Sequence, residues 1–178
     1  MRLLLLASGN GSLAQSVIDD EYDIAAVLSD NPDAYVLTRA ANSKIPSKVI
    51  KFKNPREEWD REIYEYVSTI DPDLVVSVGF MRILSGQFVE RFKTINSHPS
   101  LLPNFPGAHA VRDALAAGSK LTGCTIHWVD AGVDTGPIIA QTEVPIEAND
   151  DENSLHERIK IVERKLIVKA LEELGARS

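Results

Sequence analysis

The chain has 178 residues, of which 44% are hydrophobic and 25% are charged, and its formal net charge is -7. This composition is typical of a globular domain, and the acidic balance argues against nucleic acid as the main partner, because a phosphate backbone requires a basic face. The one cysteine, Cys124, excludes a disulfide within the chain, and no apolar run approaches the roughly 18 residues of a membrane span. We expect a cytoplasmic protein with one domain over residues 1–178 and with neither nucleic-acid nor membrane partners.

Apolar runs bounded by turn residues alternate with segments of helical spacing along the chain. The predicted elements in chain order are strand Leu3–Ala7, helix 12–20, strand Ile24–Leu28, helix Tyr35–Ser43, strand Val49–Phe52, helix Glu57–Ile70, strand Leu74–Val78, helix Gln87–Phe92, helix Val111–Ala117, strands Thr122–Val129 and Ile138–Val144, and helix Asp150–Leu174. This alternation predicts an α/β fold, with a Rossmann-like, mostly parallel twisted sheet, helices on both faces and an antiparallel strand near the C-terminal end.

Four polar segments follow predicted strands and carry the least ordinary sequence of the chain. They are Ser8–Leu13, Gly79–Leu84, Asn96–Gly107 and Asp130–Gly136. Ligands of open parallel sheets bind outside the carboxyl ends of the strands, so these segments predict a site at that edge.

A glycine-rich turn from Gly9 to Leu13 links the first predicted strand to the first predicted helix. Backbone N–H groups at the positive end of a helix bind phosphate, so the turn predicts a phosphate site. Gly9, Gly11 and Ala14 also fit the loose dinucleotide pattern, with Asp30 ending the second strand, which is a weak match. A bound dinucleotide and a tight turn without a ligand are the alternatives.

Asn96 and His98 follow the short β-like run Thr94-Ile95 and precede a loop with three prolines. Residues two apart on an extended backbone point to the same side, and proline fixes the path of the loop. The pair offers an amide donor beside an imidazole that can carry a proton near neutral pH. This arrangement suits the polarisation of a carbonyl and the stabilisation of an oxyanion.

Two aspartates and two glycines shape the segment from Asp130 to Gly136. An ordinary turn is one interpretation, because Asp and Gly are turn formers. A carboxylate near an imidazole favours the protonated imidazole, and Asp134 is the better candidate because Gly136 and Pro137 then lead into a strand.

The remaining cysteine and histidines carry weaker signals. We expect Cys124 in the core, His127 as a structural histidine within a strand, His109 at the flank of the site and His156 exposed on the last helix. No metal-ligand spacing occurs among the four histidines, so we expect no metal site.

The same segments resemble the signatures of the folate-dependent formyltransferases. The stretches that carry the resemblance are Ser8–Ser12, Gly79–Leu84, Asn96–Pro103 and Asp134–Ile139. Their order and spacing are most similar to the branch that formylates glycinamide ribonucleotide in purine synthesis, and the resemblance covers nearly the whole chain. It implies the formyltransferase fold and direct transfer of formyl from 10-formyltetrahydrofolate to the glycinamide amine. The implied partners are small molecules, the implied assembly is a monomer or homodimer, and no covalent enzyme intermediate is implied.

The resemblance also implies which residues act. Asn96, His98 and Asp134 would be the catalytic residues, with Asn96 and protonated His98 holding the oxyanion and Asp134 keeping His98 charged. Folate would meet Met81, Arg82, Ile83, Leu84, Asp130, Ala131 and Val133. The ribonucleotide would meet Gly11, Ser12, Leu13, Arg56, Lys160 and Glu163, with Glu163 on the ribose hydroxyls and Lys160 on the phosphate.

One position departs from the family. Many members have Asn where this chain has Leu13, so a side-chain contact to the phosphate is lost while the backbone N–H remains. Our hypothesis is that Lys160 compensates.

Besides a non-catalytic folate-binding protein, two alternatives to this function stay open. One is a formyltetrahydrofolate hydrolase, which carries an extra N-terminal regulatory domain that we do not expect here because Met1 lies just before the glycine-rich turn. The other is an NAD-type nucleotide-binding module, which leaves Asn96–Gly107 unexplained.

Overall fold

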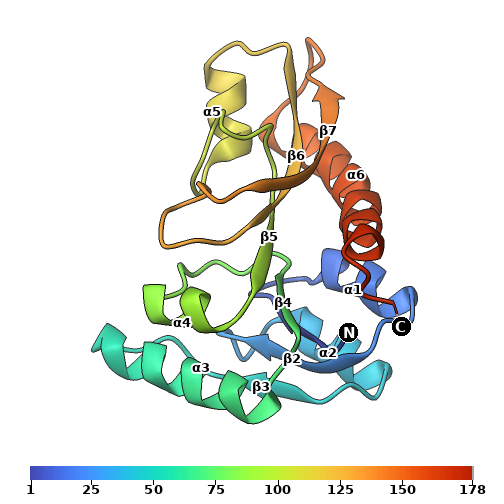
Figure 1. The fold of residues 1–178 in the computed structure, drawn as a ribbon. Helices are drawn as coiled ribbons and strands as arrows, with labels where there is room; N and C mark the ends of the chain where they lie inside the picture. Colours follow the sequence, from blue (N-terminus) through green and yellow to red (C-terminus); the bar gives the residue numbers. More distant parts are fainter. Residues whose placement is uncertain (178) are drawn as a thin grey trace.

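A seven-stranded sheet runs through the molecule, in the strand order β3-β2-β1-β4-β5-β6-β7 (Figure 1). The structure is a computed structural model and describes residues 1–177. The strands are β1 (Leu3–Leu6), β2 (Ile24–Ser29), β3 (Ser47–Val49), β4 (Leu74–Ser77), β5 (Thr94–His98), β6 (Leu121–Trp128) and β7 (Ile138–Pro145).

The strands β3, β2, β1, β4 and β5 run parallel, whereas β6 is antiparallel to β5 and β7 is antiparallel to β6. The predicted α/β fold with a mostly parallel sheet and an antiparallel C-terminal end is therefore confirmed. The parallel arrangement brings the carboxyl ends of β1, β2, β4 and β5 to one edge, where three of the four polar segments lie. The fourth, Asp130–Gly136, follows the antiparallel strand β6 and therefore starts beside the beginning of β5.

The described residues form six helices, of which the first five connect strands and the last follows β7. They are α1 (Ser12–Asp19), α2 (Tyr35–Asn42), α3 (Arg56–Ile70), α4 (Gly86–Arg91), α5 (Ala110–Ala116) and α6 (Glu152–Glu173). In Figure 1, α3 lies along the lower edge of the molecule, while α5, β6 and β7 form the upper part.

The first strand explains why helices cover both faces. Leu3 and Leu5 pack into a core shared with α1, α2 and α6, whereas Leu4 and Leu6 pack into a second core shared with α3 and α4. All four side chains are fully buried, because successive residues of a strand point to opposite faces. Each buried leucine contributes about 1.5–3 kcal/mol relative to an exposed one, so the sheet stays fixed between the two layers.

The third strand differs from its prediction. We expected Val49–Phe52, but β3 ends at Val49 because its partner β2 ends at Ser29. Ile50 makes one last backbone hydrogen bond to Ser29, and Lys51 and Phe52 then leave the sheet for the edge that carries the polar segments.

The terminal helix begins with a capping box. The Asp151 carboxylate accepts a hydrogen bond from the Ser154 N–H, and the Ser154 hydroxyl accepts one from the Asp151 N–H. This fixes the start of α6, the helix that carries Lys160 and Glu163. None of the helices within residues 1–177 is long and apolar enough to cross a membrane.

Candidate active site

The pairing of β5 with β6 brings a second histidine to the predicted catalytic pair. Asn96 lies opposite His127 in the antiparallel register, and the Asn96 Nδ2 is 3.3 Å from the His127 Nε2. The sequence reasoning treated His127 as structural. The contact with Asn96 forms through the pairing of β5 with β6, which joins residues distant in the chain.

Asp134 lies between the two histidines. Its Oδ2 is 3.3 Å from the His98 Nδ1, and its Oδ1 is 3.5 Å from the His127 Nε2. All three side chains are largely buried, at 12% exposure for Asp134, 6% for His98 and 2% for His127. The structure thus brings Asn96, His98 and Asp134 into one cluster, as the sequence predicted.

The environment of Asp134 favours its carboxylate form. Burial by itself would raise the pKa of Asp134, but hydrogen bonds from His127 and the Gly107 N–H, together with charge on His98, hold it below its usual range. The Gly107 N–H donates to the Asp134 Oδ2 at 2.8 Å. The carboxylate is therefore charged at neutral pH.

His98 faces acceptors with both ring nitrogens. Its Nε2 is 2.8 Å from the Phe105 carbonyl oxygen, which can only accept, so Nε2 carries a proton. Its Nδ1 faces the Asp134 carboxylate. A ring held between two acceptors is satisfied fully only when both nitrogens are protonated, which is the form predicted for oxyanion stabilisation.

A buried polar network holds the loop that supplies the Phe105 carbonyl. The Thr125 hydroxyl donates to the Ser100 carbonyl at 2.7 Å and accepts from the Leu102 N–H at 3.1 Å. The Gln141 amide donates to the Leu102 carbonyl at 2.8 Å. These bonds fasten the proline-rich loop to β6 and β7, so the position of the His98 ring does not depend on proline alone.

The segment from Asp130 to Gly136 is shaped by its own side chains. The Asp130 carboxylate accepts from the Gly132 N–H at 2.9 Å and from the Thr135 hydroxyl at 2.7 Å. A Cβ at Gly136 would lie 1.8 Å from the Trp128 carbonyl oxygen, so the close approach requires glycine there. The Asp130 Oδ1 accepts both of these bonds, and Ala131 and Val133 are exposed beside it.

The glycine-rich turn ends at Gly11, the N-cap of α1. Gly11 has φ of 72°, and a Cβ there would lie 2.4 Å from the Val36 Cγ2. No side chain caps the helix start, so the first N–H groups, from Ser12 and Leu13 onward, face outward. Arg39 fixes the turn by donating to the carbonyl and to the side-chain oxygen of Asn10, both at 2.8 Å.

Glu163 reaches the catalytic strand from α6. Its Oε1 accepts a hydrogen bond from the Ser97 hydroxyl at 2.7 Å. Burial raises the pKa of Glu163, and the Ser97 hydrogen bond and the charges of Lys160 and Arg164 oppose this shift only in part. Ser97 lies between Asn96 and His98, so Glu163 and the catalytic pair approach β5 from opposite faces.

Lys160 lies one turn before Glu163 on α6. Its ammonium group is 2.8 Å from the Glu157 carboxylate, and its side chain is 34% exposed. A phosphate at the start of α1 is on the same side of the sheet as α6, since both helices pack into one core.

The segment from Met81 to Leu84 divides by burial. Met81 and Ile83 are 72% and 58% exposed, whereas Leu84 packs into the core beside α4. The Arg82 side chain turns to Asp30, with its Nε 2.7 Å from the Asp30 Oδ2, and its guanidinium lies 4.3 Å from the Phe52 ring centroid.

Arg56 lies beside Ile83 and Asp60. It begins α3, and its guanidinium donates to the Ile83 carbonyl and to the Asp60 carboxylate. Because α3 and α1 pack on opposite faces of the sheet, the structure does not bring Arg56 to the glycine-rich turn. Its role as a ribonucleotide ligand stays a prediction.

The other candidates lie apart from this cluster. Cys124 is buried, and burial raises the pKa of its thiol to about 12, so it is not a ready nucleophile. His109 is exposed at the start of α5, and His156 is half-buried, not exposed as expected. Among the residues that the structure describes, no group of His, Cys, Asp or Glu is arranged to hold a metal ion.

Comparison with known proteins gives a consistent result. A protein-family model described as formyl transferase matches residues 1–171. The chain is 47% identical to a phosphoribosylglycinamide formyltransferase of Mycobacterium tuberculosis, over 98% of this chain and 85% of that protein. It is 38% identical to the Escherichia coli protein of the same name, over 93% of this chain and 83% of that one.

The solved structures agree with the sequence relatives. The crystal structure of phosphoribosylglycinamide formyltransferase from Streptococcus pneumoniae superposes with a TM-score of 0.92 at 36% identity, covering 98% of both chains. The match by family model, by sequence and by structure extends over nearly the whole length. This chain therefore belongs to the formyl transferase family.

Proposed function

We propose that this chain transfers a formyl group from 10-formyltetrahydrofolate to the amine of glycinamide ribonucleotide, in purine biosynthesis. The observation that carries the proposal is the cluster of Asn96, His98 and Asp134 at the end of β5, with Asp134 3.3 Å from His98. An amide donor, an imidazole and a carboxylate are the groups that a tetrahedral oxyanion and its proton require.

The ribonucleotide sits on the α1 and α6 side of the sheet. Its phosphate is bound by the N–H groups of Ser12 and Leu13 at the start of α1 and by Lys160. Glu163 accepts hydrogen bonds from the ribose hydroxyls with the carboxylate oxygen that Ser97 leaves free. This placement directs the amine toward the end of β5.

The folate sits on the other side of the cluster. Its ring edge meets the backbone of residues 81–84 and of residues 130–133, two segments that leave backbone groups and exposed apolar side chains at the surface. The exposed side chains of Met81, Ile83 and Val133 support this placement, because large apolar residues left in solvent mark ligand surfaces.

The reaction proceeds by direct attack. The amine nitrogen forms a bond to the formyl carbon, and the carbonyl electron pair becomes an oxyanion held by Asn96 and His98. The proton of the attacking amine passes through Asp134 and water to the N10 nitrogen of the folate. The oxyanion pair then re-forms the carbonyl as the C–N10 bond breaks with its electrons on N10, and formylated ribonucleotide and tetrahydrofolate leave.

To hold the oxyanion, His98 must exchange one of its two present hydrogen-bond acceptors. Its Nε2–H donates to the Phe105 carbonyl and its Nδ1 faces Asp134, so an oxyanion competes with one of these acceptors. Asn96 requires no exchange, because an amide has two N–H bonds and the His127 Nε2, 3.3 Å away, can accept at most one of them. We infer that the Asn96 amide makes the first contact with the formyl oxygen.

No covalent enzyme intermediate is part of the proposal. Cys124, the one thiol, is buried and has a raised pKa, and the Ser97 hydroxyl is used by Glu163. The predicted single domain over residues 1–178, the cytoplasmic location and the monomeric or homodimeric state stay predictions beside it.

A substrate-dependence assay tests the proposal. Consumption of 10-formyltetrahydrofolate should require glycinamide ribonucleotide, and His98→Ala should reduce kcat by about 10²–10⁴-fold, the range of general acid–base catalysis. Consumption at the same rate without the ribonucleotide would favour the hydrolase alternative. Saturable binding of NAD, with no formyl transfer by the folded protein, would favour the nucleotide-binding module.

A further inference from the structure

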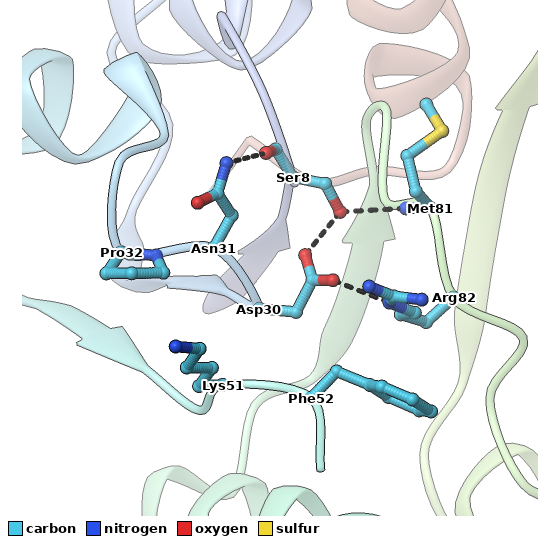
Figure 2. A pocket seen from close by; sticks show the side chains of 8 residues that line it. All are labelled: Ser8, Asp30, Asn31, Pro32, Lys51, Phe52, Met81 and Arg82. Atoms are coloured by element: carbon cyan, nitrogen blue, oxygen red, sulfur yellow. Dashed lines mark hydrogen bonds and ion pairs between the residues drawn. The ribbon is translucent and has the colours of Figure 1, made fainter.

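Asp30 is a buried carboxylate that the proposed reaction does not use. It follows β2 at the edge that carries the site, and its side chain is 3% exposed. Its Oδ1 accepts from the Ser8 hydroxyl at 2.5 Å, and its Oδ2 accepts from the Arg82 Nε–H at 2.7 Å. Figure 2 shows these side chains among those that line a cavity of about 350 Å³.

The hydrogen bonds of the Ser8 side chain form a chain in which each donor points toward Asp30. The Met81 N–H donates to the Ser8 hydroxyl oxygen at 2.8 Å, and the hydroxyl proton is then directed to Asp30. Asp30 therefore lies at the end of a relay that starts at the Met81 N–H. Met81 belongs to residues 81–84, the proposed folate segment. The relay spans the ends of β2, β1 and β4, three adjacent strands.

The relay is one of the contacts that hold residues 81–84. Met81 and Ile83 are mostly exposed, so packing of their side chains does not fix the backbone. Hydrogen bonds hold these two residues, while Leu84 packs into the core: Ser8 binds the Met81 N–H, and Arg56 binds the Ile83 carbonyl. The Ser8 N–H also donates to the Gly79 carbonyl at 3.0 Å, which ties the start of the segment to the end of β1.

The glycine-rich turn from Gly9 to Leu13, the proposed phosphate turn, has separate supports. The Gly9 carbonyl accepts from the Val36 N–H at 3.1 Å, and Arg39 holds Asn10 from the other side. Loss of the Ser8–Asp30 bond therefore weakens the support at Met81, while the turn at Gly11 keeps its anchors.

We propose that Ser8 and Asp30 are positioning residues that hold the folate segment, residues 81–84, at a fixed distance from the phosphate turn. The inference rests on the proposed function and adds two residues to it. Neither residue touches a reacting atom. Together they set where the formyl donor lies relative to the ribonucleotide amine.

Two single variants and one control test the proposal. Ser8→Ala leaves the Met81 N–H without an acceptor, and Asp30→Ala removes both the relay end and the Arg82 partner. Each should raise KM for 10-formyltetrahydrofolate about tenfold, which corresponds to roughly 1.4 kcal/mol, and leave KM for glycinamide ribonucleotide within about twofold. Asp33→Asn, at an exposed carboxylate in the same connection, is the matched control and should change neither.

The conservative variant and the double variant sharpen the test. Asp30→Asn keeps an oxygen for Arg82 and presents N–H to the Ser8 oxygen, which still accepts from Met81, so its folate KM should fall between wild type and Asp30→Ala. The double variant Ser8→Ala/Asp30→Ala should match Asp30→Ala alone, because both changes break one relay.

Some outcomes would overturn the proposal. An unchanged folate KM in Ser8→Ala and Asp30→Ala refutes it, and an equal rise of both KM values assigns the residues a general structural role instead. Titration of tetrahydrofolate into each variant makes the comparison without turnover. If wild type binds tetrahydrofolate but transfers no formyl group, the proposed function fails while a tenfold loss of binding in the variants still supports the positioning role.

Discussion

Replacement of Asp134 by asparagine changes the charge of the cluster with little change of shape. One oxygen of the new amide can still accept from the Gly107 N–H, which Asp134 binds at 2.8 Å. The other oxygen, Oδ1, becomes an NH₂ group that faces His127. His98 then loses the carboxylate that balances its positive charge.

The structure allows an estimate of the effect. Two unit charges 3.3 Å apart, as in the His98–Asp134 pair, attract by about 5 kcal/mol at an effective dielectric constant of about 20. Burial of the carboxylate offsets part of this attraction, and breaking a buried pair typically costs about 3–5 kcal/mol. Because the oxyanion requires a charged His98, we expect a loss in kcat of about 10²–10⁴-fold, equivalent to roughly 3–5 kcal/mol.

Steady-state kinetics over a range of pH measures this loss. Both KM values should stay near those of wild type, since Asp134 contacts His98 and His127 and acts in the transition state. The Asn variant should also lack the acid limb that ionisation of Asp134 gives to the wild-type kcat profile. A kcat within about threefold of wild type, with the profile unchanged, would refute the role assigned to Asp134.

Three further predictions concern the ribonucleotide site. Glu163→Gln should raise the Tm of the ligand-free protein at neutral pH, because the raised pKa of Glu163 means that its ionisation above its usual pKa of 4.5 costs stability. The increase in Tm should vanish as the pH falls to about 4.5 and below. An increase that persisted there would contradict ionisation of Glu163 as its cause. Gly11→Ala should destabilise the fold by at least about 1–2 kcal/mol in urea titrations, owing to its φ of 72° and the contact with Val36, whereas wild-type stability would show that the turn adapts. Lys160→Ala should raise KM for the ribonucleotide about tenfold and spare the folate KM; an unchanged ribonucleotide KM would remove Lys160 from the phosphate site.

The sequence predicts the elements of the sheet well for a local reason. Leu3–Leu6 and Leu74–Ser77 are buried on both faces, so they read as continuous apolar runs regardless of what covers them. The third strand was misplaced because its limits depend on where β2 ends, which its own residues do not encode. An edge strand with exposed Ser47 and Lys48 leaves little apolar pattern to detect.

The site is predictable where its residues are neighbours in the chain. Asn96 and His98 share a strand, and their spacing alone places them on one side. His127 joins them only through the antiparallel pairing of β5 and β6, and Asp30 acts through Ser8 and Arg82, which come from two other strands. Such contacts follow from the topology of the sheet. In the sequence, the signal for them was a polar residue at the end of a strand.

Transfer of a radiolabelled formyl group from 10-formyltetrahydrofolate tests the central claim most directly. The labelled donor is mixed with the protein and glycinamide ribonucleotide, and the label is followed in the ribonucleotide, in free formate and on the protein. We predict that the label moves to the ribonucleotide with an equal amount of tetrahydrofolate released and with none bound covalently to the protein. Label that accumulates in formate, or on the protein before it reaches the ribonucleotide, would contradict direct transfer at Asn96, His98 and Asp134.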